Sequence, residues 1–221
     1  MNIDTVTTHM KTLQPTAMPR ALESGIVGGA APKKEAMTAD ATTAKEKPFY
    51  EYEKEPWLSE PVDPLITNRE EYVAYTKVFS AMEQDLMRIT YDAYRRQLVD
   101  TQPDLASKNF GFTLDENASL KIIDYDNSLT EADEVALTES INNFQELKSM
   151  AQKNAKTLMT LVDHDHKTFG SRYNLNIGNF HSIIDYGKII EAGTKNMEKE
   201  WIRQVESNAE KLSYSYISIT A

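Results

Sequence analysis

The sequence predicts an α+β fold that is mainly helical: one long central amphipathic helix, further helices and a small antiparallel β-hairpin sheet. Three observations lead to this expectation. Residues 68–99 repeat apolar side chains at helical spacing, residues 110–122 alternate as paired strands do, and the segments beyond return to helical spacing.

Residues 68–99 are expected to form the central helix. One face carries an apolar stripe with spacings of three and four: Tyr72, Tyr75, Phe79, Met82, Leu86, Ile89 and Ala93. We expect later helices to bury this stripe, although the same spacing also suits a coiled-coil dimer. Asn68 and Glu71 form the expected capping box, and Gln102-Pro103 ends the helix.

A β-hairpin and a second helix are expected next. Phe110, Phe112 and Leu114 alternate, residues 115–118 supply turn chemistry, and Leu120 and Ile122 alternate again. Thr130 followed by Asp133 is typical of a helix start. The expected apolar set of that helix is Val135, Leu137 and Ile141.

Three more helical segments follow. Residues 144–167 are expected to form one helix that ends at Gly170, with the stripe Phe144, Leu147, Ala151, Leu158 and Val162. Residues 173–178 are expected to be a loop. The apolar segment 180–190 is expected to be helical and interrupted at Gly187. Thr194 is expected to cap a last helix with apolar residues Met197, Trp201, Ile202, Val205, Ala209 and Leu212, and residues 213–219 are suited to an edge strand.

Residues 112–142 resemble a hairpin-plus-helix module of uncharacterised proteobacterial proteins, some of them surface-associated or exported. The runs that carry the resemblance are Phe-Thr-Leu-Asp-Glu-Asn at 112–117, Leu-Lys-Ile-Ile-Asp at 120–124 and Asn-Ser-Leu-Thr-Glu-Ala-Asp at 127–133, followed by Leu-Thr-Glu-Ser-Ile-Asn. It covers about a seventh of the chain and implies no catalytic residues.

The chain is expected to divide into three parts. Residues 1–44 are rich in Thr and Ala, contain three prolines and show no sustained period, so we expect a disordered leader. Residues 45–66 combine four prolines with Phe49, Tyr50, Tyr52 and Trp57, which indicates an extended strap. Tyr50, Tyr52 and Trp57 either bind a partner or anchor the strap on the single helical domain expected at 67–221.

Composition excludes several kinds of chemistry. The 221 residues include no cysteine, which rules out disulfides and thiolate sites. The formal charge of −10 disfavours nucleic acid and anionic membranes. No apolar run approaches the roughly 20 residues that a membrane helix needs, and no secretory signal core is present. We therefore expect a protein partner, no membrane insertion and no cofactor.

Asp163-His164-Asp165-His166 is the one cluster of metal-ligand residue types. On a helix His164 and His166 point about 200° apart, whereas Asp163 and His166 share a face and could supply two ligands. A stable zinc site needs more than two protein ligands. A polar helix end explains the same residues, and we assign no metal.

These patterns predict a non-enzymatic protein-interaction protein. We expect a bacterial, effector-like protein, exported without a cleavable signal peptide by a route that reads the leader, with a dimer through the long helix as an option. The alternatives are a metal-dependent enzyme that uses the Asp163–His166 cluster and a cytoplasmic chaperone or regulator.

Overall fold

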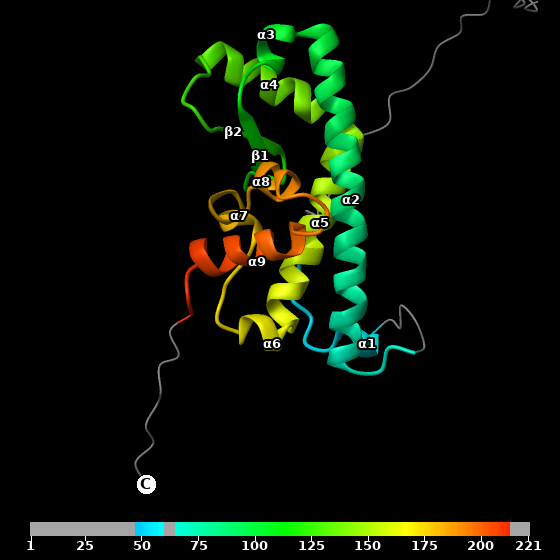
Figure 1. Ribbon diagram of the computed structural model, residues 1–221. Coiled ribbons are helices and arrows are strands. Elements are labelled where there is room, and N and C mark those ends of the chain that lie inside the picture. Colours follow the sequence, from blue (N-terminus) through cyan, green and yellow to red (C-terminus); the bar gives the residue numbers. More distant parts are fainter. Residues whose placement is uncertain (1–46, 60–64, 213–221) are drawn as a thin grey trace, which may run out of the picture. The chain divides into compact units, whose positions relative to one another are not determined.

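The computed structural model describes residues 47–59 and 65–212. The expected leader at 1–44 and the expected edge strand at 213–219 lie outside these residues. The described part is α+β and mainly helical, as predicted (Figure 1). Its elements are α1 (Pro56–Ser59), α2 (Arg69–Thr101), α3 (Pro103–Ala106), β1 (Phe110–Leu114), β2 (Leu120–Asp124), α4 (Glu131–Asn143), α5 (Gln145–His164), α6 (His166–Phe169), α7 (Ile177–Ile183), α8 (Tyr186–Glu191) and α9 (Met197–Asn208).

Helix α2 begins and ends where the sequence predicts. The Asn68 side chain accepts a hydrogen bond from the backbone N–H of Glu71 at 3.0 Å. The Glu71 carboxylate accepts from the backbone N–H of Thr67 at 2.8 Å, so the expected reciprocal bond is displaced by one residue. The helix ends at Thr101, before Gln102-Pro103.

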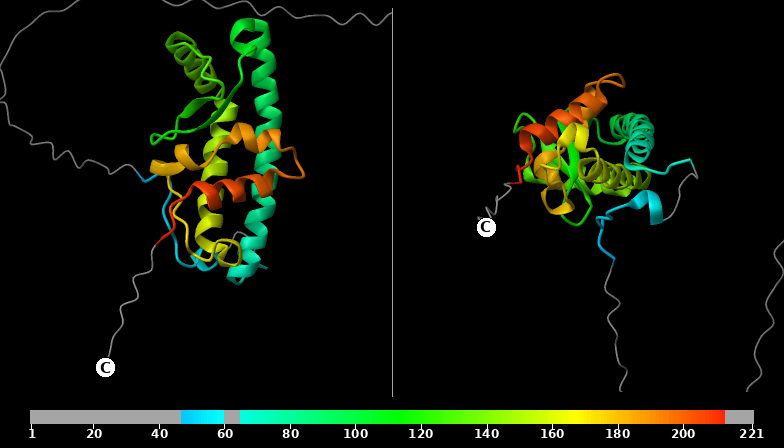
Figure 2. Two further views of the ribbon diagram at one scale, coloured as in Figure 1. Left: turned by 60° about the vertical axis from the view of Figure 1, so that its left-hand side comes forward. Right: turned by 90° about the horizontal axis from the view of Figure 1, so that it is seen from below.

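Helix α5 packs antiparallel along α2 (Figures 1 and 2). The start of α2 meets the turn after α5 through Arg69 and His166, the first residue of α6. The far part of α2 meets Phe144, the residue just before α5, through the ring of Tyr94. Helix α9 also contacts α2. The two long helices therefore form the frame on which the shorter elements pack.

The predicted stripe of α2 is not buried. Met82 is 54% exposed, Leu86 49% and Ile89 52%. A second row with spacings of three and four faces the core instead: Thr76, Ser80, Glu83, Met87, Tyr91, Tyr94 and Leu98. The expectation was wrong because apolar periodicity ignores polar side chains that find partners inside the protein. Glu83 has such partners in Asn154 and Lys153 on α5.

The predicted hairpin is confirmed. Strands β1 and β2 pair antiparallel, with Phe110 opposite Asp124 and Leu114 opposite Leu120. In the turn, the Asp115 carboxylate accepts hydrogen bonds from the backbone N–H groups of Asn117 and Ser119 at 2.9 and 2.8 Å. All five residues of β1 are buried, because β1 also contacts α7 and α8.

Helix α4 begins as predicted, with a reciprocal capping box between Thr130 and Asp133. Leu137 and Ile141 are fully buried. The expectation for Val135 was wrong, because this residue lies on the solvent side of α4, where it lines a shallow surface depression with Glu131 and Glu139.

The expected helix at 144–167 is divided. Helix α5 ends at His164, because Asp165 leaves the helical conformation and its side chain accepts from the backbone N–H of Thr168 to begin α6. Gly170 ends α6 in the left-handed conformation at φ +61°, as predicted. Within α5 the expected apolar residues Leu147, Ala151, Leu158 and Val162 are buried.

The expected break at Gly187 was misplaced. Helix α7 ends at Ile183, and Asp185 caps α8 by accepting from the backbone N–H of Lys188 at 3.1 Å. Gly187 lies inside α8 and is buried. A Cβ at this position would lie 2.7 Å from the Cα of Gly111 on β1. The glycine therefore permits α8 and β1 to approach closely.

The last helix begins later than expected. The Thr194 hydroxyl donates to the Asp85 carboxylate on α2 at 3.0 Å and does not cap a helix, and α9 starts after Asn196. Met197, Trp201 and Val205 are buried as expected, whereas Leu212 is half exposed.

Neighbouring residues of α2 test which face carries the stability. Met87 is fully buried and Leu86 is 49% exposed. We expect Met87→Ala to lower the free energy of unfolding by about 2–5 kcal/mol through lost burial and a residual cavity. Leu86→Ala should cost less than about 1 kcal/mol, because much of its surface is already in water. Chemical denaturation measures both, and equal losses would contradict this orientation of α2.

Candidate functional site

The strap residues dock on the end of α5. The Tyr50 hydroxyl donates to the Asp163 carboxylate at 2.7 Å. Burial raises the pKa of Asp163, and the hydrogen bond from Tyr50 opposes that rise. Burial and then the adjacent Asp163 raise the pKa of Tyr50. Beside this pair, the Lys156 ammonium lies 4.8 Å from the centre of the Phe49 ring.

His164 lies inside an aromatic cluster. The Tyr52 ring stacks on it at 5.6 Å between centroids, and the Trp57 and Tyr72 rings meet it edge-on at 6.0 and 5.9 Å. Burial, followed by the nearby charge of Arg69, lowers the pKa of His164. These contacts favour a neutral imidazole that packs as an aromatic ring.

The Asp163–His166 cluster is divided between different partners. Asp163 binds Tyr50, and the Nδ1 atom of His166 lies 3.0 Å from the Arg69 guanidinium on α2. Over residues 47–59 and 65–212 no group of three His, Asp or Glu side chains could hold a metal ion. The strap aromatics and the Asp163–His166 cluster, both selected from the sequence, are thus in contact and pack against each other.

A hollow of about 310 Å³ opens beside this junction, between the start of α2 and the α5–α6 turn. Arg69, Lys77 and Lys167 line it, together with Val73 and Ala74. Lys77 is paired with the Asp165 carboxylate at 2.7 Å. Sequence analysis did not select Arg69 or Lys77, because each resembles an ordinary solvent-facing charge of an amphipathic helix.

The exposed apolar side chains of α2 form a second candidate site. Val78, Met82, Leu86 and Ile89, here called the outer stripe, are each 49–58% exposed. They follow one another at spacings of four, four and three residues, and therefore lie on one side of the helix. In the right view of Figure 2, α2 lies at one side of the described elements, whereas in the left view the connection from α8 to α9 reaches beyond it. Sequence analysis selected three of these residues but expected them to be buried, and it missed Val78.

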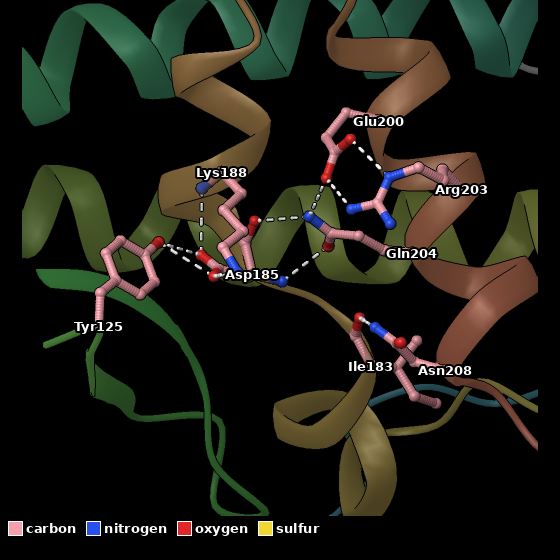
Figure 3. A network of polar contacts seen from close by, with 8 residues as sticks. All are labelled: Tyr125, Ile183, Asp185, Lys188, Glu200, Arg203, Gln204 and Asn208. Carbon is pink, nitrogen blue, oxygen red and sulfur yellow. Dashed lines mark hydrogen bonds and ion pairs between the residues drawn. The ribbon is translucent and has the colours of Figure 1, made fainter. Parts of the chain in front are cut away.

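A network of polar side chains joins the hairpin to α8 and α9 (Figure 3). The Tyr125 hydroxyl donates to the Asp185 carboxylate at 2.8 Å. The Gln204 amide accepts from the backbone N–H of Asp185 at 2.8 Å and donates to its carbonyl at 3.2 Å. Burial and then Asp185 raise the pKa of Tyr125, which favours the protonated phenol that donates to Asp185. The network holds three elements together.

Comparison with family models, curated proteins and solved structures finds no match to this chain. Among the described residues no helix combines the length and apolar character needed to cross a membrane. The functional conclusion therefore depends on the chain's own surface and contacts.

We expect the free energy of unfolding to depend on pH through His164. Its pKa in the folded protein lies below the ordinary 6.5, so between the two values the unfolded chain binds more protons. The contribution of His164 to the free energy of unfolding is complete above pH 6.5. It is lost as the pH falls through the pKa of His164 in the folded protein. We expect His164→Phe to flatten this part of the stability profile, measured by denaturation at several pH values. His181→Phe, at an exposed histidine, is the control, and an unchanged profile in His164→Phe would contradict the assignment.

Proposed function

We propose that this protein acts by binding another polypeptide chain through the outer stripe of α2, and that it catalyses no reaction itself. The observation that carries the proposal is four adjacent large aliphatic side chains, each about half exposed, on one continuous helix. Single exposed apolar residues are ordinary, whereas a contiguous patch is typical of an interaction surface.

The spacing of the outer stripe defines the chemistry of its partner. Three members of the outer stripe, Met82, Leu86 and Ile89, continue a row that begins at Tyr75 and Phe79 and alternates in spacings of four and three, which is the repeat of a helix that packs against another helix. Tyr75 and Phe79 are partly exposed and their rings lie 4.5 Å apart, so they extend the stripe. An amphipathic helix with its own apolar stripe fits this surface.

The absence of catalysis is proposed because the best-formed polar clusters of the described residues are occupied internally. Tyr50 and Asp163 bind each other, and Tyr125 and Asp185 do the same. Catalytic acids and bases need pKa values near the working pH, whereas both tyrosines have raised pKa values. These groups are suited to holding structure.

The strap aromatics remain a predicted second contact for a partner. Tyr50 and Trp57 are engaged by the helical domain through Asp163 and His164. Tyr52 stacks on His164 but keeps 60% of its surface exposed. We therefore place the main binding surface on α2 and keep Tyr50, Tyr52 and Trp57 as a prediction.

Site-specific photo-cross-linking tests the binding function. A photoreactive residue at Met82, which is 54% exposed, is expected to give a covalent adduct with a polypeptide in the producing cells. Val135 on α4 is the matched control, because it is apolar and 53% exposed but lies apart from the outer stripe. No adduct at Met82, or equal adducts at both positions, would contradict the proposal.

We also propose that the protein is exported from a bacterial cell and that residues 1–44 are the signal. The support is compositional. Four acids and four bases balance in this segment, ahead of a domain that carries the whole charge of −10. A leader of this composition, recognised as an extended chain, could be engaged while the domain stays folded.

Deletion of residues 1–44 tests the export proposal. We expect the melting temperature to stay unchanged and the protein to disappear from the medium of secretion-competent cells. Export without the segment would contradict the role of the leader. Retention of the intact full-length protein inside the cells would favour the alternative of a cytoplasmic chaperone or regulator.

A further inference from the structure

The outer stripe lies between opposite charges. Glu71 is exposed near the start of α2, and Arg96 is exposed near its end. On a helix of 3.6 residues per turn these two residues and the stripe share one side. At about 1.5 Å per residue, Glu71 and Arg96 are about 38 Å apart along the axis. Along this side of α2, Glu71 precedes the outer stripe and Arg96 follows it, with Asp85 beside the stripe and Asp100 one turn beyond Arg96.

This surface is nearly symmetric about one point of the sequence. The midpoint of Glu71 and Arg96 falls between residues 83 and 84, and the midpoint of Val78 and Ile89 falls at the same place. A second α2 rotated by 180° about this point would place Val78 beside Ile89 and each Glu71 beside an Arg96. Met82 would lie level with Asp85 of the second copy, about one residue from Leu86. Such self-complementarity is what a two-fold interface requires.

We propose that the partner of the outer stripe is α2 of a second copy of this chain, packed antiparallel about a two-fold axis near residues 83 and 84. The inference rests on the proposed binding function and names its partner. Two Glu71–Arg96 contacts would form in each dimer. A parallel pair would instead set Glu71 beside Glu71 and Arg96 beside Arg96, which like-charge repulsion disfavours.

The nearly balanced charge of α2 also favours a second copy of this chain as the partner. The helix contains five basic and six acidic residues, whereas the whole chain carries −10. Two copies that meet through α2 therefore bring together the nearly neutral part of an acidic protein. Asp85, the partly exposed acid nearest the proposed axis, is held on its own chain by the Thr194 hydroxyl at 3.0 Å and lies 3.8 Å from Arg88.

Both charged ends are available to a partner. Hydrogen bonds from Thr67 fix the Glu71 carboxylate in place and lower its pKa, so the group is ionised at neutral pH. Arg96 is exposed at the other end. Charge reversal at Arg96 therefore changes the proposed contact and leaves the helix cap intact.

Sedimentation of the full chain over a wide concentration range tests the inference. The wild type is expected to dimerise. Ile89→Glu should be monomeric with a nearly unchanged melting temperature, because it places a charge in the stripe and removes no buried side chain. Val135→Glu should dimerise like the wild type. A wild type that stays monomeric at every concentration, or a dimer that survives Ile89→Glu, would overturn the proposal.

Charge reversal tests the antiparallel arrangement. Arg96→Glu should raise the dissociation constant on the order of tenfold at low ionic strength, because both contacts in the dimer become repulsive. Mixing Arg96→Glu with Glu71→Arg should restore association, because each mixed dimer regains both opposite-charge contacts. An unchanged constant for Arg96→Glu would overturn the arrangement. So would no recovery in a mixture in which Glu71→Arg, which loses its hydrogen bonds from Thr67, keeps the wild-type melting temperature.

The Met82 cross-link separates this inference from the function on which it rests. An adduct with the mass of two copies supports both. An adduct with a different polypeptide, together with a monomeric wild type, overturns self-pairing and leaves the binding function standing. No adduct overturns both.

Discussion

The packing of α2 against α5 is the constraint on which the rest of the structure depends. At its centre Glu83 is 3% exposed; its carboxylate accepts from the Asn154 amide at 3.2 Å and lies 3.5 Å from the Lys153 ammonium. A buried carboxylate is costly unless such partners are present. Rotation of α2 to bury Leu86 would remove Glu83 from these partners. The polar cluster thus fixes which side of α2 faces the core and leaves the apolar side in water.

Local signals explain why many element boundaries could be predicted. Asn68, Thr130 and Gly170 act through bonds or backbone angles within a few residues, so sequence spacing reveals them. The break before α8 depends on contacts that spacing does not contain. Asp185 is held by Tyr125, 60 positions earlier, and by Gln204 on α9. The prediction of which side of α2 is buried was wrong for the same reason, because the partners of Glu83 lie on another helix.

At the candidate site, too, the sequence indicated which residues matter but not which of them are in contact. Aromatic rings in the strap and the Asp163–His166 cluster were both selected from the sequence, since their residue types are unusual in those positions. Tyr50 and Asp163 are 113 positions apart, and only the fold brings them to 2.7 Å. The hydrogen bond between them satisfies both polar groups, so Asp163 serves as an anchor for the strap and not as a metal ligand.

The close approach of Gly111 and Gly187 limits how this sequence can diverge. A Cβ on Gly187 would lie 2.7 Å from the Cα of Gly111 and 2.6 Å from the Tyr125 hydroxyl oxygen. A larger residue at one glycine cannot be accommodated by shrinking the other, because neither has a side chain to lose. Tyr125 and Asp185 border the same contact. Two glycines 76 positions apart, both in contact with the same tyrosine–aspartate pair, are therefore a signature by which distant relatives of this fold could be recognised after the rest of the sequence has changed.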